Sequence, residues 1–125
     1  MFRFVLLTAV FIVVFAGCGS ARVTGEREAF RLSHVPDSHK SGYLRANSLI
    51  NSGDYYLNEG LAAPEKKNKV KCLTTAAGKY GKALDILKEI LAEVTDDTDR
   101  EFITHVIEDT QSSLEEAVHS IPILD

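Results

Sequence analysis

The stretch at residues 66–94, KKNKVKCLTTAAGKYGKALDILKEILAEV, has the most regular hydrophobic pattern in the chain. Its apolar residues recur at alternating intervals of three and four, which is the repeat of an α-helix with one buried face. Ala76, Ala83 and Ile90 widen this face, so we expect the helix to pack against two neighbours. The stripe consists of Val70, Leu73, Ala77, Tyr80, Leu84, Leu87, Leu91 and Val94.

Glycine residues leave the continuity of two segments open. Gly78 and Gly81 lie inside the 66–94 stripe, and a break near Gly78 is the alternative to one continuous helix, because glycine costs roughly 1 kcal/mol in a helix interior. Gly53 and Asp54 interrupt a second periodic segment at 38–63 in the same way. That segment is either one long helix or two short helices joined by a turn.

The ends of the helical segments are marked by capping residues and prolines. Asp37 or Ser38, after Pro36, is the expected N-cap of the 38–63 segment, and Pro64 ends it. A third helix is expected at about 98–119, after a group of Thr and Asp residues that favour a helix N-terminus.

The sequence predicts an all-α fold, a small antiparallel helical bundle, because no alternating run of β-branched residues occurs after residue 17. The expected order is a signal peptide, a flexible tether, the helical domain and a short tail. The corresponding ranges are 1–17, 18–37, 38–121 with helices at about 38–63, 66–95 and 98–119, and 122–125.

Two glycine–tyrosine motifs suggest a more specific helical architecture. Gly78, Tyr80 and Ala83, and less completely Gly53 and Tyr55, resemble the turn and second-helix start of tetratricopeptide repeats. The two glycines are 25 residues apart, whereas the family repeats every 34. The resemblance implies helical hairpins as an alternative to a plain bundle.

The N-terminus has the pattern of an export signal. Arg3 is followed by an apolar run over residues 4–16 that only Thr8 interrupts, and small residues come next. A membrane-spanning helix needs roughly 20 apolar residues, so a span is the weaker interpretation of this run.

Phe15-Ala16-Gly17-Cys18 resembles the lipobox of bacterial lipoproteins. The resemblance implies that Cys18 is diacylated on sulfur and becomes the new N-terminus, so that membrane lipid is a partner of the chain. Two acyl chains hold a soluble domain at a membrane stably, whereas one does so only marginally. The expected location is the exported face of a membrane, the outer membrane where a cell has two, since Gly19 follows the cysteine where Asp would favour the inner one.

The composition excludes one large class of partner. The chain has 14 Lys and Arg against 18 Asp and Glu, a formal net charge of −4. Nucleic-acid binding depends on a basic face, so we expect no nucleic-acid partner. Lipidation of Cys18 would leave Cys72 without an intramolecular disulfide partner, and we expect Cys72 to be a partly buried structural residue.

No catalytic, cofactor or metal site is predicted. The sequence contains no Gly-x-Ser-x-Gly and no Gly-rich phosphate loop, so we do not expect an enzyme. The histidines show no ligand spacing and are expected to be solvated. They are His34, His39, His105 and His119.

Two functions are consistent with these features. The first is a membrane-anchored protein-interaction or scaffold module for an unidentified envelope protein. The alternative is a small-ligand carrier or enzyme accessory with an apolar pocket between helices. Tyrosine is common where one end of a side chain is buried and the other is wet. The expected interaction surface therefore consists of Tyr43, Tyr55, Tyr56 and Tyr80.

The lipoprotein hypothesis predicts that Cys18→Ser releases the protein from the membrane fraction or leaves it unprocessed, because the acceptor sulfur is lost. Fractionation and gel migration of the parent and the variant measure this. A variant that fractionates and migrates like the parent would contradict the hypothesis.

Overall fold

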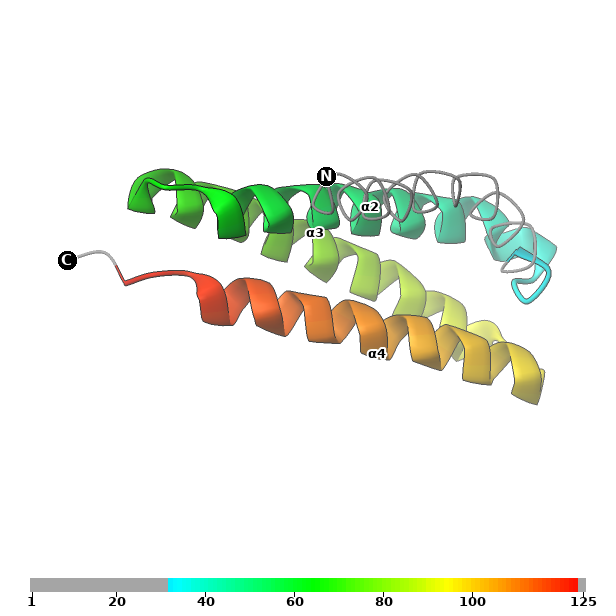
Figure 1. The fold of residues 1–125 in the computed structure, drawn as a ribbon. Helices are drawn as coiled ribbons and strands as arrows, with labels where there is room; N and C mark the ends of the chain where they lie inside the picture. The colour runs from blue at the N-terminus through cyan, green and yellow to red at the C-terminus, as the bar shows by residue number, and fades with distance from the viewer. Residues whose placement is uncertain (1–31, 124–125) are drawn as a thin grey trace, which may run out of the picture. The chain divides into compact units, whose positions relative to one another are not determined.

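The computed structural model describes residues 32–123, and no β-strand occurs among them. Figure 1 shows three long α-helices, which confirms the predicted all-α bundle. The helices predicted at 66–95 and 98–119 are found with bounds that lie within two residues of the predicted ones. The elements after Ser33 are the 3₁₀-helix η1 (Asp37–His39) and the α-helices α2 (Lys40–Ala62), α3 (Lys66–Glu93) and α4 (Asp97–Ser120).

Helix α3 is the central element of the bundle. It packs along both α2 and α4, whereas α2 and α4 contact each other at few points. In Figure 1, α2 lies above and α4 below, and α3 crosses behind them. The wide apolar face of α3 therefore has two neighbours, as its sequence predicts, and the three helices do not close into a symmetrical bundle.

Both helices continue through the glycines at which a break was considered. Gly53 lies within α2 and Gly78 within α3, and none of the described glycines has a positive φ. The turns that the tetratricopeptide resemblance places at these residues are therefore absent. The cost of a glycine in a helix is small beside the packing of a helix with 23 or 28 residues.

Glycines allow α2 and α3 to approach closely. A Cβ on Gly53 would lie 2.7 Å from Cε1 of Tyr80, and a Cβ on Gly60 would lie 2.8 Å from Cγ of Leu73. Real Cβ contacts are essentially never this short. The Tyr80 ring and the Leu73 side chain therefore occupy space that any larger residue at 53 or 60 would need.

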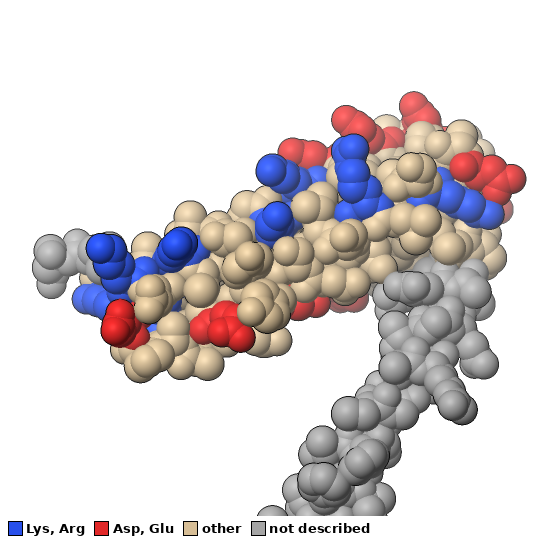
Figure 2. Space-filling view, turned by 90° about the horizontal axis from the view of Figure 1, so that it is seen from above, with Lys and Arg blue, Asp and Glu red and all other residues tan. Residues whose placement is uncertain are grey.

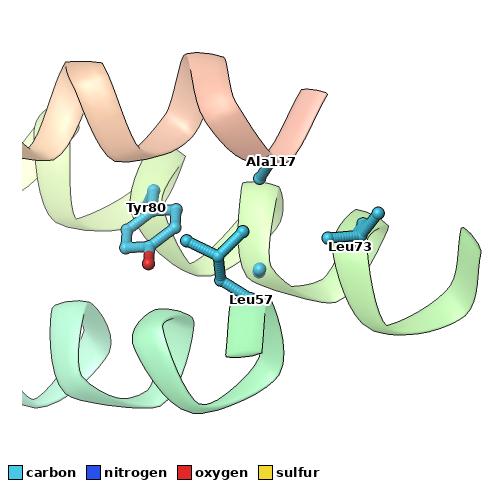
Figure 3. Packing of buried hydrophobic residues seen from close by; sticks show 5 residues of the cluster. Leu57, Leu73, Tyr80 and Ala117 are labelled. Carbon is cyan, nitrogen blue, oxygen red and sulfur yellow. The ribbon is translucent and has the colours of Figure 1, made fainter. Parts of the chain in front are cut away.

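The core lies where all three helices meet. Figure 3 shows Leu57 of α2, Leu73 and Tyr80 of α3, and Ala117 of α4 around one centre. Tyr80 and Leu73 are completely buried. Leu84 and Leu87, at the centre of the sequence stripe, are also buried. The apolar stripe at 66–94 is thus the main component of the core.

Long basic side chains stabilise both turns between helices. Lys69 Nζ donates to the carbonyl oxygens of Gly60 and Leu61 at 2.9 and 3.0 Å, at the end of α2. Arg100 Nη1 donates to the carbonyls of Leu91 and Val94, both at 2.8 Å, at the end of α3. These bonds satisfy helix C-terminal carbonyls that have no partner within the helix.

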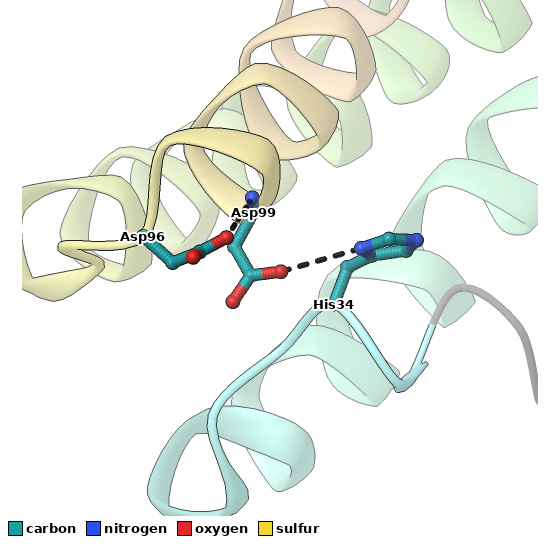
Figure 4. Close-up of polar contacts among 3 residues, drawn as sticks. All are labelled: His34, Asp96 and Asp99. Carbon is teal, nitrogen blue, oxygen red and sulfur yellow. Dashed lines mark hydrogen bonds and ion pairs between the residues drawn. The ribbon is translucent and has the colours of Figure 1, made fainter.

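The segment before α2 packs onto the start of α4. Figure 4 shows Nδ1 of His34 facing Oδ1 of Asp99, 3.3 Å away, and the amide of Asp99 donating to the N-cap residue Asp96. The His34 ring also stacks on Phe102, with centroids 5.1 Å apart. Val35 is buried. The helical unit begins at His34, so the tether predicted at 18–37 ends earlier than expected.

The N-terminus of α2 also differs from the prediction. Asp37 and Ser38 belong to η1, and the N-cap residue of α2 is His39, which makes no side-chain capping bond. Nε2 of His39 instead pairs with a carboxylate oxygen of Glu93, at the end of α3. A tertiary contact thus replaces the local cap that the sequence predicted.

The close approach at Gly53 predicts opposite effects for two glycine-to-alanine changes. Gly53→Ala should destabilise the protein by about 1–2 kcal/mol, because overpacking against Tyr80 outweighs alanine's helix propensity. Gly78→Ala should stabilise it by about 0.5–1 kcal/mol, because no atom lies within 4 Å of the added Cβ. Urea denaturation of the full chain measures both. A Gly53→Ala variant at least as stable as the parent would refute the packing argument.

Candidate interaction groove

A groove runs along the seam between α2 and α3. It consists of two adjoining depressions of about 460 and 400 Å³, which share Arg45, Ile86 and Glu89. No α4 residue lines either of them. The other lining residues are His39, Ser41, Gly42 and Leu49 before or in α2, and Lys82, Asp85, Ile90, Ala92 and Glu93 in α3.

The floor of the groove is apolar because of the residues that face each other across the seam. A Cβ on Gly42 would lie 3.7 Å from Ile86 and 3.9 Å from Ile90, which is ordinary van der Waals contact. Alanine would therefore fit at 42, unlike at Gly53. Leu49 extends the floor towards the middle of α2. The absence of a side chain at 42 leaves the half-buried Ile86 accessible from the groove, whereas Ile90 is only 2% exposed.

Charged side chains border this floor. Asp85, Glu89 and Glu93 follow one another at intervals of four residues, so they lie along one edge of α3. Arg45 stands on the α2 side and Lys82 at one end. Figure 2 looks onto α2 and α3, and its right-hand half shows acidic side chains along the upper edge with Lys and Arg side chains below them.

The groove is an open surface depression with an apolar floor. It is open to solvent along its length. His39 and Ser41 both line it, but no hydrogen bond joins their side chains within the described residues. Within residues 32–123, no three His, Cys, Asp or Glu side chains form a group that could hold a metal ion. The groove offers an apolar strip with a charged border, which is the usual composition of a protein-binding surface.

The four tyrosines predicted as an interaction surface do not form one. Tyr80 is completely buried in the core, and Tyr43 is buried with its ring 6.2 Å from that of Phe102. The prediction is therefore wrong for these two residues. Tyr55 is 59% exposed and Tyr56 is half-buried, and their rings meet edge to face at 5.2 Å. Neither lines the groove.

Two of the four histidines are not solvated as predicted. His34 and His39 contact Asp99 and Glu93, and their side chains are only 20% and 22% exposed. His105 and His119 are exposed on α4. Cys72 is a free thiol beside Gly60, and it is partly buried, as predicted.

Tyr80 is a buried phenol held by polar groups from both other helices. Its hydroxyl donates to Oδ1 of Asp54 on α2 at 2.5 Å. Burial, and then the hydrogen bond and charge of Asp54, raise the pKa of Tyr80 above its usual range, although a hydrogen bond with Ser113 of α4 acts in the opposite direction. The phenol therefore stays protonated in the folded protein at pH values where an unfolded tyrosine ionises.

This raised pKa predicts a loss of stability in alkali. The neutral Tyr80 stabilises the fold fully below the unfolded tyrosine pKa of about 10, and the stabilisation declines as pH rises above that value. Tyr80→Phe should reduce this alkaline decline, although it lowers stability at pH 7 by roughly 1 kcal/mol through the lost hydrogen bond. Urea denaturation from pH 8 to pH 11 measures both. Equal slopes above pH 10 in the parent and the variant would contradict the assignment.

Cys18 lies outside the described residues, so the lipidation hypothesis is untested by the geometry. No helix among residues 32–123 combines the length and the apolar character that crossing a bilayer requires. Comparisons of the chain with protein families, with curated proteins and with solved structures found no match.

Proposed function

We propose that the protein is a membrane-anchored lipoprotein whose helical unit is a protein-interaction module. The open groove between α2 and α3 carries this proposal. It exposes an apolar floor between charged edges, and most of its residues belong to two long helices that pack closely against each other at Gly53 and Gly60. A rigid, amphipathic groove binds a segment of another protein without rearranging.

The shape of the groove favours a polypeptide over a small molecule. Small-ligand sites enclose their ligands and bury roughly 70–90% of the ligand surface. The two depressions are instead open and continuous, and they follow the helix axes. A chain segment laid along the seam would contact both depressions at once, whereas a small molecule in either would stay largely exposed. The carrier function is therefore the weaker proposal.

The membrane anchor is proposed from the N-terminal sequence alone. A charged residue, an apolar run and small residues precede Cys18 in the order that lipoprotein signals require. Such an anchor would hold the helical unit on the exported side of a membrane, where the partner would be another envelope protein.

Site-specific photocrosslinking in cells that express the full chain tests the proposed function. A photoreactive residue at Arg45, inside the groove, should give discrete protein adducts. The same residue at Gln111, which is exposed on α4, should give few. Adducts of equal yield from both positions, or adducts from Gln111 alone, would contradict the assignment of the groove as the binding surface.

A further inference from the structure

We propose that the α2–α3 groove receives an amphipathic helix of the partner protein, with Lys or Arg residues along the flank of that helix that faces α3. This inference rests on the proposed function and specifies the chemistry of the partner. Three features of the groove lead to it: its length, its apolar floor and the distribution of its charges.

The length of the groove suits a short helix. Its α3 wall extends from Lys82 to Glu93. At 1.5 Å per residue this wall is roughly 17 Å long, which is about three helical turns. A bound helix of about eleven residues would span the wall, and its side chains would recur at the same interval as those of α3.

The floor provides contacts for an apolar stripe. Leu49 and Ile86 are half-buried, so part of each side chain is still available to a partner. Gly42 has no side chain, so no Cβ covers Ile86 at this point of the floor. Helix-in-groove recognition uses apolar residues at positions i, i+3 or i+4, and i+7 of the bound helix. Apolar residues at this spacing would contact Leu49 and Ile86 one after another along the groove.

The charges determine which helix fits. All three acidic residues of α3, Asp85, Glu89 and Glu93, line the groove, whereas only Lys82 of its seven lysines does. Glu93 pairs with His39. Within the described part of the chain, the side chains of Asp85 and Glu89 take part in no hydrogen bond or ion pair. A basic flank on the partner would supply their missing counter-charges.

Arg45 restricts the basic residues to one flank of the partner helix. It stands on the α2 wall, opposite the acidic edge of α3. Lys or Arg residues on both flanks would place like charges beside it, which is unfavourable. The structure therefore favours a helix that is basic towards α3 and neutral or acidic towards α2.

Two matched peptides test this inference. Each is a fluorescent 14-residue helical peptide with leucines at positions 3, 7, 10 and 14. One peptide carries Lys on one flank of the leucine stripe, and the other carries Glu at the same positions. Fluorescence anisotropy measures their binding to the full chain in nanodiscs of phosphatidylcholine, with empty nanodiscs subtracted. We expect the Lys peptide to bind the protein more tightly than the Glu peptide.

Three variants locate the binding. Asp85→Lys combined with Glu89→Lys should weaken the Lys peptide about tenfold and improve the Glu peptide. Glu108→Lys combined with Asp109→Lys changes the net charge equally on the exposed face of α4 and should leave both affinities within twofold. Gly42→Leu, which fills the floor, should weaken both peptides. Far-ultraviolet circular dichroism verifies that each variant is folded.

The outcomes separate this inference from the proposed function. Equal binding of both peptides to the parent, or equal losses in the two charge variants, would overturn the inference about the basic flank. If Gly42→Leu still abolished binding in that case, the groove would remain the interaction site. If neither peptide bound, the helical partner would be refuted, and crosslinks from Arg45 would then decide whether the groove binds a protein of another kind.

Discussion

The bundle depends on the antiparallel register of α2 and α3, in which small residues of one helix face large residues of the other. Gly53 lies against Tyr80, and Gly60, seven residues later, lies against Leu73, seven residues earlier. The same register places Ala46 opposite Leu87, and both are completely buried. Shifting either helix by one residue would bring a side chain into the space of the Tyr80 ring. This steric constraint therefore fixes which face of α2 and which face of α3 pack against each other.

One side of α3 is covered by α2, so α4 can pack only on the part of the apolar face of α3 that α2 leaves uncovered. Tyr80 joins the two packing surfaces, since its ring fits over Gly53 while its hydroxyl interacts with Asp54 of α2 and Ser113 of α4. Direct contact between α2 and α4 is therefore unnecessary for most of their length. The same geometry leaves the opposite side of the α2–α3 seam without a covering helix among the described residues, and the groove lies there.

The positions of the helices and their buried faces were predictable from the sequence. The contacts that single residues such as Gly53 make in the core were not. The three helices follow from apolar spacing, because burying a stripe outweighs the cost of one glycine. Gly53 could either break the helix or make room for an aromatic ring from a neighbouring helix. Which of the two occurs depends on Tyr80, which is 27 positions away in the sequence. The recurrence of small residues at 46, 53 and 60 is a signal that could have shown close packing. The sequence predicts Tyr80 both in the buried stripe of 66–94 and in an interaction surface. Its residue type does not decide between the two, since tyrosine is common at surfaces and in cores alike.

The groove illustrates why the charge of a segment is a poor guide to its partner. Helix α3 carries seven lysines against three acidic residues, and counted as a segment it is basic. However, four of its seven lysines lie in its first two turns, and Lys71, the last of these four, is separated from Asp85 by about 21 Å along the helix axis. At physiological ionic strength, exposed charges are screened over about 8 Å. A ligand in the groove would therefore respond to Asp85 and Glu89, and hardly at all to the basic end of the same helix.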